Sequence, residues 1–111
     1  MIVEFVQFTY PPGMTREQIL EARTTIPRWQ ANKELIRKHY IAGENGTGGA
    51  FYIWPSKEAA QRGHDAAWRA NIEKRTGSTP VITYFDLLMI VDNEAGTTTE
   101  FPPTVSAEAA E

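Results

Sequence analysis

The pattern of apolar and polar positions divides most of the chain into strands and two helical regions. Strands are predicted where β-branched and aromatic side chains concentrate, at residues 2–10, 35–43, 49–54 and 81–91. Segments with helical periodicity lie between them, at residues 15–32 and 57–76. The order β-α-β-β-α-β predicts an α+β, ferredoxin-like fold, in which two helices cover one face of a four-stranded antiparallel sheet.

Short polar signals mark where the helices begin and end. Thr15 followed by Gln18 is a capping-box pattern, and Ser56 is placed to cap the second helix. Pro27 lacks an amide donor and clashes with the preceding turn, so we expect a kink or break there. Gly77 is placed to end the second helix, a continuous one by this pattern, in the left-handed conformation.

The predicted strands are apolar on both faces. The runs IVEFVQF, AFYIW and VITYFDLLMIV lack the alternation expected of a sheet with one face in water. We therefore expect a homodimer, in which a second copy of the chain covers the face away from the helices. Residues 1–93 form the predicted domain. Residues 94–111 are rich in Thr, Glu, Pro and Ala, and we expect either a flexible tail or an arm that docks on a partner.

The second helix predicts an unusual inner face made of small and polar residues. Its outer stripe is charged: Glu58, Arg62, Asp65 and Arg69. The opposite stripe is Ala60, His64, Ala67 and Asn71, flanked by Gly63 and Trp68. Such small side chains leave volume that must be filled. Either strand aromatics fill it, or it is a pocket with His64 and Asn71 as its polar groups.

Two ionisable residues on inner faces are candidates for catalysis. His64 is either a hydrogen-bonded structural residue or a general base near pH 7, and no carboxylate lies one turn away on its own helix to orient it. Any orienting group must therefore come from a strand or from the neighbourhood of Arg23. Arg23 itself faces inward beside Trp29, and it either extends out to water or contacts an anionic or enolic ligand.

Composition excludes several classes of function. The 111 residues suit one domain, and a net charge of −3 favours binding neither to nucleic acid nor to an anionic membrane. The chain has no cysteine for disulfide or thiolate chemistry and no apolar run long enough for a membrane helix. Its first ten residues lack the features of a signal peptide, so the expected location is cytoplasmic.

No self-sufficient catalytic motif occurs. The glycine-rich segment 43–49 lacks the Lys-Ser/Thr of a phosphate loop and precedes a strand, so Asn45-Gly46 is better explained as a hairpin turn. The two histidines lie on separate elements without metal-ligand spacing, so no metal site is predicted. Nucleophile-elbow and dinucleotide-binding patterns do not occur.

Four runs carry a resemblance to a known family: LIRKHYI, GGAFYIWPSKEAA, HDAAWR and TYFDLLMIVDN. Over residues 3–93 the chain resembles the YdhR-type monooxygenases of the dimeric α/β-barrel superfamily, which also contains the antibiotic-biosynthesis monooxygenases. The resemblance implies two sheets packed face to face, with a ligand pocket between each sheet and its own helices. It also implies oxidation of a small aromatic or polyphenolic compound by molecular oxygen, with no cofactor.

The resemblance also bears on particular residues. Some relatives use asparagine, tryptophan and arginine as polar contacts, and Trp68 and Asn71 match the first two of these types. Haem-degrading members use a histidine late in the second helix. Residues 73–76 are Glu, Lys, Arg and Thr instead, which argues against haem degradation.

A second resemblance keeps other functions open. The opening MIVEFVQFTYPPGMT is similar to that of muconolactone isomerases, although their later histidine and tryptophan motifs do not follow. One fold hosts many reactions. A cofactor-independent monooxygenase, a proton-transfer isomerase or lyase, and a non-catalytic small-molecule-binding dimer therefore all remain candidates.

The candidate site combines these arguments. His64 and Arg23 are the predicted catalytic residues. The predicted substrate-binding residues are Trp68, Asn71, Trp29, Tyr52, Trp54 and Tyr84.

Overall fold

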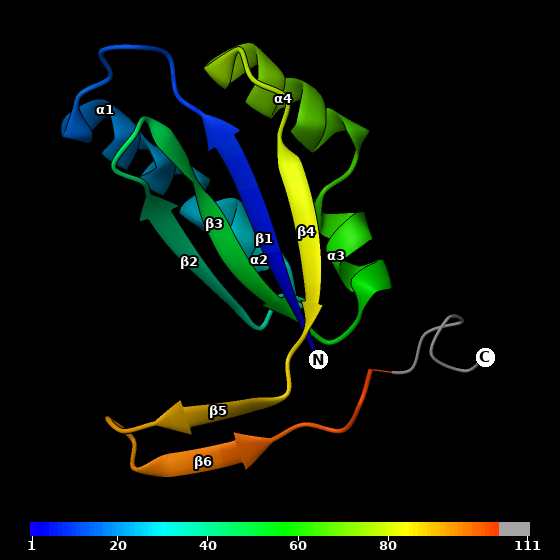
Figure 1. Cartoon of the computed structure of the whole chain (residues 1–111). Coiled ribbons are helices and arrows are strands. Elements are labelled where there is room, and N and C mark those ends of the chain that lie inside the picture. The colour runs from blue at the N-terminus through cyan, green and yellow to red at the C-terminus, as the bar shows by residue number, and fades with distance from the viewer. Residues whose placement is uncertain (105–111) are drawn as a thin grey trace.

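Four strands form one antiparallel sheet that confirms the predicted ferredoxin-like topology. A computed structural model describes residues 1–104 of the chain. The strand order is β2-β3-β1-β4, with the helices together on one face of the sheet (Figure 1). The strands are β1 (Ile2–Thr9), β2 (Arg37–Ala42), β3 (Thr47–Trp54) and β4 (Val81–Asp86). The order of elements along the chain is the predicted β-α-β-β-α-β.

The first helical region is broken near Pro27, as predicted. It consists of α1 (Arg16–Leu20), a 3-10 segment η1 (Glu21–Thr25) and α2 (Ile26–Ala31), which has Pro27 in its first turn. A proline there needs no amide partner, so the break falls just before it. The capping box is also confirmed, because Thr15 accepts a hydrogen bond from the Gln18 amide and Gln18 accepts one from the Thr15 amide.

The second helical region is two helices, and the prediction of one continuous helix is wrong. They are α3 (Lys57–Gly63) and α4 (Ala66–Thr76). His64 leaves the helical conformation, with φ −115° and ψ 64°. Asp65 then caps α4 by accepting a hydrogen bond of 2.9 Å from the Trp68 amide. Gly77 ends α4 in the left-handed conformation, as predicted.

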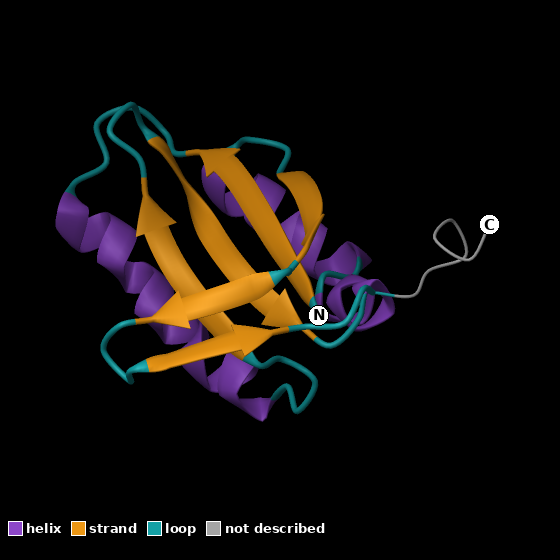
Figure 2. Ribbon diagram, turned by 60° about the horizontal axis from the view of Figure 1, so that its bottom comes forward, coloured by secondary structure: helices purple, strands orange, loops and turns teal. Residues whose placement is uncertain are grey.

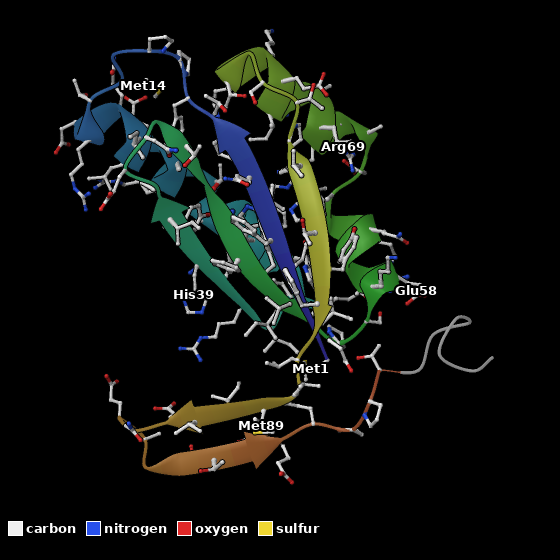
Figure 3. The ribbon with its side chains drawn as sticks, in the orientation of Figure 1. Met1, Met14, His39, Glu58, Arg69 and Met89 are labelled. Carbon is white, nitrogen blue, oxygen red and sulfur yellow. The ribbon has the colours of Figure 1, made fainter. Side chains whose placement is uncertain are left out.

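This break changes which residues face the sheet. The predicted outer stripe is exposed, and Figure 3 shows Glu58 and Arg69 on the outside of α3 and α4. The inner stripe is confirmed for Ala60 and His64, which are buried. It is wrong for Ala67 and Asn71, which are exposed because α4 starts again with a new phase. Instead, α4 buries three residues one turn apart: Trp68, Ile72 and Thr76.

The last predicted strand is also divided. β4 ends at Asp86, and residues 89–92 form β5 (Met89–Asp92), which pairs with β6 (Thr97–Glu100) in a separate hairpin. The hairpin lies beyond the end of the sheet in Figure 1, and Figure 2 shows it crossing in front of the sheet with the helices behind. Ordered structure therefore extends past residue 93, where the predicted tail begins. Docking of this segment on a partner stays a prediction, and residues 105–111 lie outside the described part of the chain.

Both faces of the sheet bear apolar side chains, as predicted. On the helix side, Val6 and Trp54 are among the most deeply buried residues. On the other side the Phe5 and Phe51 rings stack with their centroids 4.6 Å apart, and Phe85 is 50% exposed. Within residues 1–104, no helix is long and apolar enough to cross a membrane.

Candidate functional site

Four ionisable side chains form one row across the sheet on its helix-facing side. The register pairs Lys38 with Tyr52, Tyr52 with Glu4, and Glu4 with Tyr84, so the row runs through all four strands. Side chains on one face of a strand recur every second residue, and Glu4 therefore lies between the apolar Ile2 and Val6. The row places charged and phenolic groups in the layer that normally contains only apolar side chains.

Glu4, at the centre of this row, is fully buried. Its Oε1 accepts a hydrogen bond of 2.9 Å from Trp54 Nε1, and His64 Nδ1 lies 2.8 Å from the same oxygen. The geometry of the second contact does not meet the criteria for a hydrogen bond. A carboxylate removed from water is costly unless it is paired. Trp54 and His64 are the groups that pair with it.

His64 is enclosed by aromatic rings. Its ring centroid lies 4.2 Å from that of Trp68, 4.5 Å from Tyr52 and 5.2 Å from Trp29, and its side chain is 1% exposed. Of the two expected sources of an orienting group, a strand and the neighbourhood of Arg23, the strand is the one that brings a carboxylate to His64, that of Glu4 on β1. Strand aromatics fill the space beside Gly63, where an added Cβ would lie 2.5 Å from Cη2 of Trp54. His64 is therefore sealed in, and its catalytic role stays a prediction.

A cavity of about 560 Å³ opens next to this sealed cluster, between the sheet, the first helical region and α4. Its volume lies within the range of about 300–1,000 Å³ that is typical of small-molecule sites. Trp29, Tyr52 and Trp68 form part of both the His64 enclosure and the cavity wall. Lys38 and Arg75 also line the cavity, so it combines aromatic surface with positive charge.

Lys38 is a strongly perturbed ionisable group of this cavity. Its Nζ lies over the rings of Tyr40, Trp29 and Tyr52, at 3.9, 4.5 and 4.8 Å from their centroids. Burial, together with the positive charges of Arg75 and Arg28, lowers the pKa of this amine to about 7. At neutral pH a large share of Lys38 is therefore uncharged and able to accept a proton.

The sequence analysis did not identify Lys38, which lies between the exposed Arg37 and His39 in the chain. His39 does project from the edge strand β2 (Figure 3), but Lys38 points to the opposite face. The available signal was the alternation along β2, combined with a pairing that sets Lys38 opposite Tyr52. Glu4 was also missed. It occupies a buried position of the alternating pattern of β1, where the other inward positions are apolar.

The tyrosines of the row remain protonated. Burial, followed by the nearby charge of Glu4, raises the pKa of Tyr52 well above its usual value. The same two causes raise the pKa of Tyr84. Both hydroxyls are therefore available as neutral donors.

The other predicted site residues are divided between two places. Arg23 is exposed at the rim of the cavity, and its Nε donates a hydrogen bond of 2.9 Å to the Leu20 carbonyl. Asn71 lines a neighbouring hollow between α2 and α4, which shares Trp29, Trp68 and Arg75 with the cavity. Trp54 and Tyr84 do not line the cavity. The structure thus gathers Trp29, Tyr52 and Trp68 at the cavity beside His64, with Arg23 at its rim. Whether any of these residues contacts a substrate stays a prediction.

Ligands for a metal do not come together in the part of the chain that the structure describes. Across residues 1–104 there is no group of three histidine, aspartate or glutamate side chains that could hold an ion.

The fold is similar to that of several solved proteins. One is a protein of unknown function from Nitrosomonas europaea, 20% identical, with a TM-score of 0.67 over 81% of this chain and 91% of that chain. Another is an antibiotic biosynthesis monooxygenase, 12% identical, with a TM-score of 0.60 over 79% of this chain and 99% of that chain. A third is SnoaB, a cofactor-independent oxygenase from Streptomyces nogalater, 16% identical, with a TM-score of 0.52 over 78% of this chain and 92% of that chain.

These similarities concern the fold. They agree with the fold implied by the resemblance to the dimeric α/β-barrel superfamily, and they do not distinguish the YdhR-type group within it. No protein-family profile matches the chain, and no curated protein matches it in sequence.

Proposed function

We propose that this chain is a cofactor-independent monooxygenase that oxidises a small aromatic or polyphenolic compound inside the 560 Å³ cavity. The observation that carries the proposal is the position of Lys38, a partly neutral amine held among three aromatic rings at the cavity wall. Two of the similar solved proteins are, by name, an antibiotic biosynthesis monooxygenase and a cofactor-independent oxygenase, which supports the reaction class.

The chemistry begins with removal of a proton. Neutral Lys38 accepts a proton from an acidic C–H or O–H group of the substrate, which leaves an ammonium next to an enolate or phenolate. Arg75, on α4, adds a second positive charge to the same cavity. Positive groups placed beside such an anion stabilise it as its charge develops.

The electron-rich anion then reacts with oxygen. In a substrate with a CH₂ group next to a carbonyl or aromatic ring, the carbanion and O₂ form a peroxide anion. This anion takes the proton back from the Lys38 ammonium and becomes a hydroperoxide. Loss of water then leaves a carbonyl. The balance is CH₂ plus O₂ giving C=O plus H₂O, so molecular oxygen is the oxidant and no other electron donor is needed.

His64 acts in this proposal through the cavity wall. Its ring packs against Trp68 and Tyr52, which both line the cavity, and Glu4 fixes the ring from β1. Trp29 completes this wall, while Arg23 adds positive charge at the rim. Direct proton transfer by His64 would require Tyr52 or Trp68 to move aside.

We further propose that the protein works as a cytoplasmic homodimer. The face of the sheet away from the helices bears the stacked Phe5–Phe51 pair and the half-exposed Phe85. Exposed apolar surface of this kind is typical of a protein interface. A second copy of the chain, with its own apolar sheet face, is the partner that fits this surface.

A proton-transfer isomerase is the second candidate, because the same neutral Lys38 that begins an oxygenation is able to move a proton within a substrate. A non-catalytic binding dimer is the third.

Oxygen uptake separates these candidates. With anthrone as the substrate and no added metal or flavin, the proposal predicts consumption of one O₂ for each anthraquinone formed. Incorporation of solvent deuterium without oxygen uptake would instead support the isomerase. Binding of anthrone without either reaction would leave a binding protein and contradict the proposal.

A further inference from the structure

The surroundings of Lys38 suit a second use of its amine. The Nζ atom is placed on the wall of a cavity large enough for a small molecule, so a ligand is able to reach it. The Lys38 amine is not part of an ion pair in the described residues. Within residues 1–104 the ion pairs are Arg62–Glu34 and His64–Glu4, and neither involves Lys38. The amine therefore has no carboxylate holding it in the charged form.

The charged and titratable groups around Lys38 favour its neutral form. Arg28 approaches from α2 and Arg75 from α4, and both positive charges oppose a third one. Tyr40 on the same strand and Tyr52 on β3 present ring faces, which attract an ammonium and so offset part of this repulsion. Glu4 is one position further along the row, where it is paired with Trp54 and His64.

A desolvated lysine next to other cations is the arrangement that makes an amine nucleophilic toward carbonyl groups. The other three lysines of the chain, at positions 33, 57 and 74, are exposed. Lys57 is the useful comparison because its Nζ lies 4.9 Å from one ring centroid, that of Tyr84, but on the outside of the protein. Like Lys38, Lys57 has an aromatic ring beside its amine, but its side chain is exposed to water.

We propose that Lys38 forms a covalent imine with aromatic aldehydes or ketones that enter the cavity, so that this site captures carbonyl compounds through its amine. The inference goes beyond the proposed oxygenation, because it requires the cavity and Lys38 but neither oxygen nor any oxidant.

The step balances without a further reactant. The lone pair of neutral Nζ attacks the carbonyl carbon, and a proton moves from nitrogen to oxygen to give a carbinolamine. Loss of one water molecule then leaves a C=N bond between the ligand and Lys38. Arg75, on the same cavity, is placed to stabilise negative charge as it develops on the carbonyl oxygen.

Reductive trapping tests this inference directly. The intact protein is treated at pH 7, under nitrogen, with benzaldehyde and sodium cyanoborohydride, and is then digested and mapped by mass spectrometry. At pH 7 the neutral fraction of Lys38 exceeds that of an ordinary exposed lysine by about 10³-fold. Part of this advantage is offset by the lower basicity of the amine. We therefore expect benzylation of Lys38 at least about tenfold faster than that of Lys57.

Two further measurements keep the result unambiguous. The labelling rate at Lys38 should rise with pH and have its midpoint near pH 7. In the Lys38→Met variant the fast label should disappear, while the slow labels on the other lysines remain. Equal labelling of Lys38 and Lys57, or labelling of Lys57 alone, would overturn the inference. Oxygen uptake with anthrone, measured on the same preparation, tests the oxygenase proposal separately from imine formation.

Discussion

The space between the sheet and the helices has two halves, in which the ionisable groups have opposite surroundings. In the closed half, around His64, aromatic rings occupy the space and Glu4 is paired with both His64 and Trp54. In the open half, around Lys38, the same layer contains a cavity, and the amine has positive neighbours. A buried polar group that loses its partner is costly, so the residues of this closed cluster depend on one another for the stability of the fold. An unpaired amine beside a cavity instead remains available to a ligand.

This difference suggests that the closed half contributes mainly to stability and the open half to reactivity. The closed half fixes the positions of Tyr52 and Trp68, whose other sides form the wall of the open half. Loss of a group from the closed half should therefore reduce stability first. Loss of Lys38 should reduce reactivity and leave the fold intact.

The largest effect is expected from Lys38→Met. Turnover of anthrone should fall by about 10²–10⁴-fold, the usual contribution of a positioned general base. The thermal unfolding midpoint should not decrease, because the substitution removes a desolvated amine. Lys57→Met is the matched control and should retain full turnover. Equal losses in the two variants would contradict the assignment of the open half as the reactive one.

A large loss of stability is expected from His64→Ala. The variant leaves the buried Glu4 carboxylate with Trp54 as its hydrogen-bond donor, and it also creates a cavity. Breaking a buried pair in this way typically lowers the free energy of unfolding by about 3–5 kcal/mol. Ala67→Leu, at an exposed position of α4, should change it by less than about 0.5 kcal/mol. Urea denaturation measures both, and a mild effect at His64 would show that the pair is dispensable.

A smaller effect is expected on the opposite face of the sheet. Phe85→Glu places a charge within the proposed dimer interface, and loss of an aromatic residue that anchors an interface commonly weakens association by about 30-fold. Sedimentation equilibrium at several concentrations should show the variant dissociating where the original chain does not. Arg69→Ala, on the outer surface of α4, is the control. If the unmodified chain has the mass of one protomer at micromolar concentration, the result contradicts the proposed dimer.

The pH dependence should be modest and of defined sign. The pKa of Lys38 falls from 10.5 to about 7 on folding, so the neutral, reactive form increases with pH. Turnover should rise about tenfold between pH 6 and pH 8. Between pH 7 and 10.5 the unfolded state binds more protons than the folded state at this residue. The stability difference from Lys38→Met should therefore diminish as pH rises through that window.

Much of the fold was predictable because its signals are local. The capping box at Thr15, the break near Pro27 and the left-handed Gly77 each depend on a few neighbouring residues. The break at His64 was not predicted, because a strong helical charge stripe runs through it. It depends on Trp54 filling the space beside Gly63 and on Asp65 capping a new helix.

The candidate site was only partly predictable. His64, Trp68 and Tyr52 were predicted as a group, and they are in contact. Lys38 and Glu4 were not identified, since their importance depends on strand register, which pairs residues far apart in the sequence. The division of residues 81–91 into β4 and β5 was also missed, because both parts are apolar and no proline or glycine separates them.

The central claim is that ligands bind in the open half, and amide chemical-shift mapping tests it most directly. A ¹⁵N-labelled sample is titrated with 1-naphthol, a small phenol that fits the aromatic and cationic character of the cavity. The account predicts that the largest shifts occur at Lys38, Tyr40 and Arg75, and that they disappear in the Lys38→Met variant. Shifts confined to Phe5, Phe51 and their neighbours on the other face of the sheet would contradict it.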